Sequence, residues 1–137
     1  MIKDPGEIER RLCKIEGRPV KSCIDVAIHA YDIRPTEEDR LLARAVQFPF
    51  CIMQPTSAAS AAMVEFMERY LRVVQHFTRA GECCLMGIKT SRQRPDHVGV
   101  LTNRGLWHYR IRGVVECVPP SVKMDSLLAR TLMVFAP

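Results

Sequence analysis

The chain has 137 residues, 47% of them hydrophobic and 26% charged, which is typical of one folded domain and excludes a disordered tail. Its net charge of +5 comes with scattered arginines and no basic block, so we expect a solvated surface and no nucleic-acid partner. No apolar run reaches the roughly 18 residues of a membrane span, and the charged first stretch does not resemble a signal peptide, so we expect a protein made in the cytoplasm.

Helical spacing of apolar residues predicts four helices in the first half of the chain. They are expected over 7–15, from 22 or 23 to 34, from 36 to about 46, and from 57 to about 73. Ser22 is the expected N-cap of the second helix, and Thr36, followed by three acidic residues, that of the third.

Short runs rich in valine, isoleucine and leucine follow from residue 83 onward and predict strands. They are expected over 83–88, 97–102, 106–111, 114–118 and 131–135, with a hairpin at residues 103–105. We therefore expect a single α+β domain over 1–137, in which a helical part (about 1–78) packs on a C-terminal antiparallel sheet (about 81–137).

Six cysteines occur without any C-x-x-C pair, which argues against a zinc knuckle. In a chain made in the cytoplasm they are expected to be reduced thiols. A metal site built from Cys83, Cys84, His97 and His108 has poor spacing and is the last alternative. We expect no metal and no cofactor.

Cys23 is predicted at the N-terminus of the second helix. Unpaired backbone N–H groups and the helix dipole favour a thiolate there, and the charge of Lys21 acts in the same direction. The alternative is a small buried thiol, which is how most free cysteines behave. The residue pattern leaves both a nucleophile and a structural cysteine open.

His97 and His108 lie on consecutive predicted strands, on either side of the 103–105 turn. A loop of two or four residues puts both on one face of the sheet, whereas a three-residue loop without a bulge puts them on opposite faces. Gly99 is expected to leave room beside them for a helix end that carries a thiol. His29 and His76 are assigned to helix surfaces.

These residues would supply what thiol catalysis needs: a nucleophile (Cys23), a base (His97) and a group that orients the base (His108). Lys21, Ser22 and Gly99 are expected to contact the substrate. N–H groups at the start of the helix, near Cys23, could also bind the oxyanion of an acyl intermediate.

Three stretches resemble NlpC-type papain-like cysteine peptidases: RPDHVGV at 94–100, GLWH at 105–108 and GVV at 113–115. SCIDVA at 22–27 is similar to the cysteine helix of that family. The resemblance runs from about residue 23 to the C-terminus, is most specific over 81–118, and is closest to short stand-alone members encoded in phage and prophage tail modules. It implies a papain-like fold with Cys23 as nucleophile, His97 as general base and His108 as orienting residue.

The resemblance further implies a hydrolase that cleaves peptide bonds of peptidoglycan stem peptides during phage entry, or that acts in tail assembly. Its expected partners are the peptidoglycan peptide and other tail proteins, and its expected place is the virion tail at the bacterial cell wall. An alternative of another class is a structural component of the tail tip, with an inactive triad and a fixed copy number in a ring. A third alternative makes the basic surface a nucleic-acid binder, with a steep dependence of affinity on salt. The scarcity of stacking aromatics on the strands argues against it, since Trp107 and Tyr109 share a strand face that can equally be core.

Overall fold

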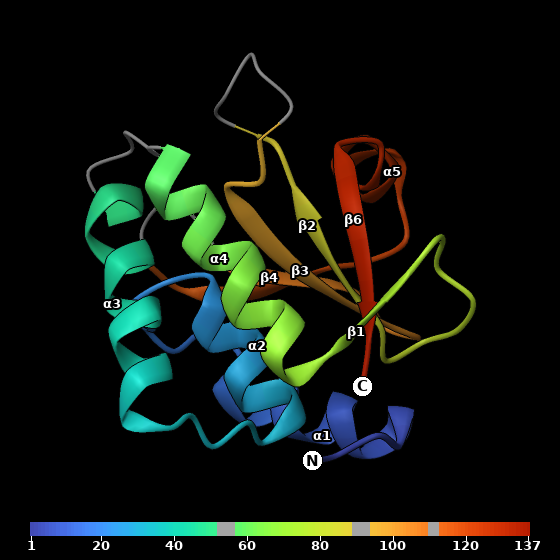
Figure 1. Ribbon diagram of the computed structural model, residues 1–137. Helices are drawn as coiled ribbons and strands as arrows, with labels where there is room; N and C mark the ends of the chain where they lie inside the picture. The colour runs from blue at the N-terminus through green and yellow to red at the C-terminus, as the bar shows by residue number, and fades with distance from the viewer. Residues whose placement is uncertain (52–56, 89–93, 110–112) are drawn as a thin grey trace.

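The computed structural model describes residues 1–51, 57–88, 94–109 and 113–137, and within them it confirms the expected α+β architecture (Figure 1). The helices are α1 (Pro5–Ile15), α2 (Ile24–Tyr31), α3 (Glu37–Cys51), α4 (Ser57–Tyr70) and α5 (Val122–Leu128). The strands are β1 (Arg72–Val74), β2 (Cys83–Met86), β3 (His97–Thr102), β4 (Gly105–Tyr109), β5 (Val115–Val118) and β6 (Thr131–Ala136). They form an antiparallel sheet in the order β1-β6-β2-β3-β4-β5.

The two faces of the sheet bury different sets of side chains. One face presents Val98, Val100 and Trp107 to α1, α2 and α4, and the large core lies between them. The opposite face carries a smaller apolar cluster around Met86 and Leu106, which apolar residues of α5 cover. Figure 1 shows α5 beside β6, apart from the four N-terminal helices. Among the helices described, none is both long and apolar enough to cross a bilayer.

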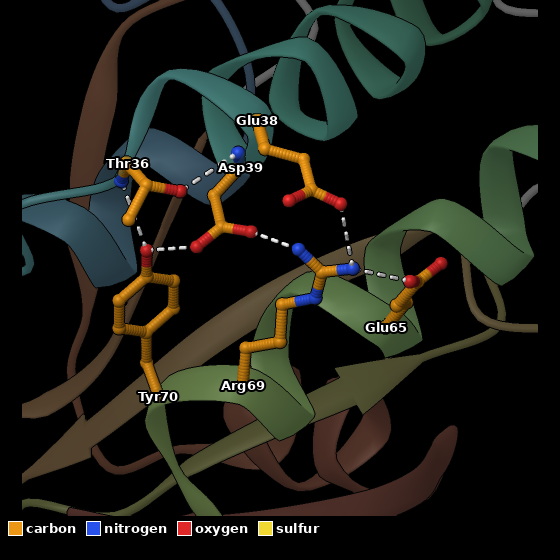
Figure 2. Close-up of polar contacts among 6 residues, drawn as sticks. All are labelled: Thr36, Glu38, Asp39, Glu65, Arg69 and Tyr70. Atoms are coloured by element: carbon orange, nitrogen blue, oxygen red, sulfur yellow. Dashed lines mark hydrogen bonds and ion pairs between the residues drawn. The ribbon is translucent and has the colours of Figure 1, made fainter.

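A polar network fastens α3 to α4 (Figure 2). The buried carboxylate of Asp39 accepts hydrogen bonds from the Tyr70 hydroxyl and the Arg69 guanidinium. Arg69 also lies 2.7 Å from Glu65 on its own helix. The Thr36 hydroxyl accepts from the Asp39 N–H at 3.2 Å, which is the cap expected for the third helix. This network explains why a helix with so polar a first turn packs firmly against its neighbour.

The sequence prediction is wrong at several element boundaries and misses two elements among the described residues. The third helix runs to Cys51 instead of about 46, and the strand expected over 83–88 ends at Met86. The fourth helix ends at Tyr70 rather than near 73, because residues 72–74 form β1 and pair with 134–136 of β6. The second helix begins at Ile24 with Cys23 as its N-cap residue, so Ser22 is not the cap. Helix α5 was not expected; the Ser121 hydroxyl caps it by accepting from the Met124 N–H at 3.2 Å. Residues 110–111 of the expected strand 106–111 lie outside the described residues.

Candidate active site

The hairpin of β3 and β4 places the two histidines on the same face of the sheet. Thr102 pairs with Gly105 and Gly99 with His108, so a two-residue loop joins the strands. His97 lies two residues before Gly99 and therefore shares the face of His108. Its Nε2 lies 2.9 Å from Nδ1 of His108, and the rings meet edge to face at 78°. Of the loop lengths that the sequence left open, two, three or four residues, the structure has two.

A buried hydrogen bond holds this hairpin in register. The indole N–H of Trp107 donates to the Thr102 hydroxyl at 2.9 Å, and both side chains are buried. Gly105 has a φ of 141°, and a Cβ there would lie 2.1 Å from the Val118 carbonyl oxygen, so only glycine fits. Because Trp107 is fully buried in the core, it offers no stacking platform to a nucleic acid.

Glu116 belongs to the site and was missed by the sequence analysis. It pairs directly with His108 across β4 and β5, and its Oε1 lies 2.8 Å from His108 Nε2. His97, His108 and Glu116 therefore form one continuous hydrogen-bonded chain over three neighbouring strands. The signal in the sequence was a single carboxylate inside the apolar run 114–118. Its partner could not be read without the register of β5 against β4.

Two backbone hydrogen bonds to β5 hold the segment before Cys23 at one end of the sheet. This segment pairs with the outer edge of β5: Gly17 N–H donates to the Val115 carbonyl at 2.8 Å, and Val20 N–H to that of Gly113 at 2.9 Å. Cys23 follows three residues later, at the end of the sheet where β5 begins and β4 ends. It is 3% exposed and makes no side-chain cap to α2.

The far end of α2 shows that this helix runs antiparallel to β3. The Tyr31 hydroxyl donates to the Gly81 carbonyl at 2.7 Å, and Gly81 N–H donates to that of Leu101 near the end of β3. Eight helical residues span about 12 Å. The stretch of β3 from Leu101 back to His97 spans about 13 Å. The N-terminus of α2, with Cys23, therefore lies toward the end of β3 at which His97 begins.

Cys23 and the histidines approach this end of the sheet from different sides. Cys23 belongs to the core that contains Val98 and Val100, on the face covered by the N-terminal helices. His97 pairs with Met86 and shares its face, which is the one under α5. His97 is the first residue of β3 and therefore lies at the end of that strand. The structure joins the histidines to each other and to Glu116, and places Cys23 at the same end of the sheet.

The turn before α2 is closed by a carboxylate. Asp25 Oδ2 accepts from the backbone N–H groups of Lys21 at 2.9 Å and Ser22 at 3.2 Å. The Lys21 side chain is exposed, whereas Ser22 is buried, and within the described part of the chain its hydroxyl has no hydrogen-bond partner. The Asp25 carboxylate therefore stabilises the backbone turn that precedes Cys23. The expected contact of Lys21 and Ser22 with a substrate stays a prediction.

The sequence analysis expected Gly99 to leave room for a helix end, and the structure shows that this is wrong. A Cβ at this position would lie 2.9 Å from the Leu106 Cδ1 and 2.9 Å from the Met86 Cε. The space above Gly99 is therefore filled by apolar side chains of the neighbouring strands β2 and β4. Its role in binding a substrate stays a prediction.

The adjacent cysteines of β2 cannot both join the histidines in a metal site. Successive strand residues point to opposite faces, and Cys83 lies in the large core while Cys84 lies in the cluster under α5. Burial raises the pKa of Cys84 to about 12 and that of Cys83 further still, so both are poor nucleophiles and poor ligands. Over residues 1–44, 57–88, 94–109 and 113–137, no group of three or more His, Cys, Asp or Glu side chains is arranged to hold a metal ion.

Comparisons with protein-family models, with curated proteins and with solved structures each gave no match to the chain. A functional assignment therefore depends on the geometry of the site and on its motifs.

Proposed function

We propose that the chain is a cysteine hydrolase of the NlpC type, with a papain-like arrangement, that cleaves peptide bonds of peptidoglycan stem peptides. Its place would be a phage tail, where it acts at the bacterial cell wall during entry or in tail assembly with other tail proteins. The observation that carries the proposal is the 2.9 Å contact between His97 and His108, at the start of the strand that bears the HVGV motif. The placement of Cys23 toward that end of β3 supports it.

The reaction would proceed in two displacements. The Cys23 thiol gives its proton to His97, and the thiolate attacks the carbonyl carbon of the peptide bond. The tetrahedral intermediate collapses to a thioester as His97 returns the proton to the leaving amine. His97 then takes a proton from water, whose oxygen attacks the thioester; the acid is released and the proton returns to the thiolate. His108 holds the His97 ring in place throughout.

A second candidate is a structural component of the tail tip that retains this fold without catalysis. The observation that favours it is the burial of Cys23, whose residue is only 3% exposed. Both candidates predict the same fold, so the reactivity of the thiol distinguishes them.

The test is the rate of alkylation of Cys23 by iodoacetamide as a function of pH, followed residue by residue by mass spectrometry. Cys13 is exposed and would react first, so all variants carry Cys13→Ser. For a hydrolase, Cys23 reacts at pH 7 nearly as fast as at high pH, and His97→Ala slows it by about tenfold at that pH. His76→Ala, at an exposed histidine, is the matched control and changes nothing.

Cys23 that reacts only above about pH 8, as an unperturbed thiol does, contradicts the hydrolase and leaves the structural component. So does a rate at pH 7 that is the same in His97→Ala. If the thiol is reactive, digestion of purified muropeptides by the wild type and by Cys23→Ser tests the substrate class. Cleavage that persists in Cys23→Ser excludes this cysteine as the nucleophile.

A further inference from the structure

Glu116 is linked to His97 through a shared neighbour. One contact joins Glu116 Oε1 to His108 Nε2 at 2.8 Å, and the other joins His108 Nδ1 to His97 Nε2 at 2.9 Å. Both distances are those of hydrogen bonds, and each such bond needs one donor and one acceptor. The two imidazoles therefore cannot choose their tautomers independently.

The Glu116 carboxylate determines which nitrogen donates in each hydrogen bond between Glu116, His108 and His97. A carboxylate only accepts hydrogen bonds, so His108 Nε2 carries the proton and donates. A neutral imidazole has one N–H, so His108 Nδ1 is then the acceptor. It follows that His97 donates from Nε2, and that the lone pair of neutral His97 is on Nδ1.

We propose that Glu116 is a positioning residue, which acts through His108 to hold His97 in the tautomer whose Nδ1 can accept a proton. This inference rests on the proposed function, because the role of His97 as a base is part of that function. It goes beyond it by assigning to β5 a residue that none of the matching motifs contains.

The surroundings of Glu116 suit this role. It faces His108 directly in the register of β4 and β5, and its side chain is 23% exposed, so water competes little for the bond. Lys123 approaches the same Oε1 at 3.9 Å, but its side chain is 68% exposed and an ion pair of this kind contributes little. Of these two contacts, the hydrogen bond to His108 is the one that orients the carboxylate.

Strand β5 also supports the turn that presents the thiol. Val115, next to Glu116, accepts from Gly17 N–H at 2.8 Å and donates to the Arg18 carbonyl at 3.1 Å. The same strand thus carries the carboxylate on one side chain and, through its outer edge, the backbone that leads to Cys23.

The experiment measures the tautomers directly, by long-range ¹H–¹⁵N correlation spectra of the histidine rings in ¹⁵N-labelled full-length protein. His97→Gln and His108→Gln assign the signals. In the wild type, with both rings neutral, we expect protonated Nε2 and unprotonated Nδ1 in both. Glu116→Met, of similar length but without an acceptor, should leave His108 as a mixture of tautomers. Glu116→Gln, whose amide oxygen still accepts, should restore the wild-type pattern.

Lys123→Met is the matched control, since it removes the ion pair at the same oxygen and keeps the acceptor; its spectrum should match the wild type. A wild-type spectrum with the His108 proton on Nδ1 overturns the proposal, even if Glu116→Met does not fold. An unchanged pattern in folded Glu116→Met also overturns it. The spectra report on the histidine tautomers whether or not the protein is an enzyme. If the tautomers are as expected but His97→Ala does not change the alkylation rate of Cys23, the proposed function fails and the role of Glu116 stands.

Discussion

Replacing Thr102 by valine tests what holds the histidines on one hairpin. The Thr102 hydroxyl accepts the indole N–H of Trp107 at 2.9 Å, and both residues are buried next to the two-residue turn. Valine has nearly the same shape but no acceptor. The variant therefore removes one hydrogen bond and leaves a buried N–H without a partner, while packing changes little.

The expected loss of stability follows from that buried donor. A buried donor left unsatisfied costs about 1–3 kcal/mol in the free energy of unfolding. For a chain of this length, that corresponds to a fall in Tm of about 4–12 °C. The Thr102 hydroxyl also accepts from the Arg104 N–H at 3.2 Å, but this group lies at an exposed turn, where water replaces the lost acceptor.

The assay is urea unfolding followed by intrinsic fluorescence, which reports on this site because Trp107 is the only tryptophan. Thr102→Ser is the matched control: it keeps the acceptor oxygen and loses only a methyl group, so it should retain most of the stability. The reasoning is refuted if Thr102→Val unfolds at the urea concentration of the wild type. It is also refuted if Thr102→Ser loses as much stability as Thr102→Val.

Two further predictions concern the helical layer and the sheet. The Tyr70 hydroxyl donates to Asp39 and lowers the pKa of that carboxyl. The ionised carboxylate therefore contributes its full stabilisation above the unfolded-state pKa of about 3.9, and this stabilisation is lost as pH falls through the lower folded-state pKa. Asp39→Asn should remove this acid-dependent part of the unfolding free energy, measured by urea titrations between pH 7 and pH 3; an equal acid dependence in both proteins would contradict it. Gly99→Ala should cost less than the roughly 1–3 kcal/mol of typical overpacking, because the atoms that its Cβ meets at 2.9 Å, Leu106 Cδ1 and Met86 Cε, are the ends of flexible side chains. Leu106→Val in the same chain should recover part of the loss. No recovery in a urea titration would count against this crowding.

Local patterns were enough to predict most elements of the fold. Strand β3 has the predicted bounds, because its apolar run is bounded by clear turn residues on both sides. Thr36 caps its helix as expected, since capping depends only on residues three positions apart. Strand β1 was missed because its three residues are specified by pairing with β6, which lies 60 residues away. Helix α5 has only seven residues, so the helical spacing of Met124, Leu127 and Leu128 is too short a pattern to predict a helix.

The candidate site was predictable in its residue types but not in its connections. The sequence paired His97 with His108, yet their common face depended on whether the turn has two or four residues, or three. The function of Gly99 was inferred from the absence of a side chain, but which neighbour fills the space is decided by the packing of β2 and β4. Glu116 was out of reach for the same reason, because its partner is set by strand pairing rather than by any spacing along the chain.

The register of β5 is therefore the condition on which the hydrogen-bonded chain depends. Side chains alternate between the two faces, so a slip of one residue would turn Glu116 toward the helix-covered face and bring Val115 or Cys117 opposite His108. Neither could accept the proton of Nε2 as a carboxylate does. The pairing of residues 17–20 along the outer edge of β5 opposes such a slip, because backbone hydrogen bonds would break on both sides of the strand at once. The turn that carries Cys23 and the carboxylate that orients the histidines are thus fixed by the same strand.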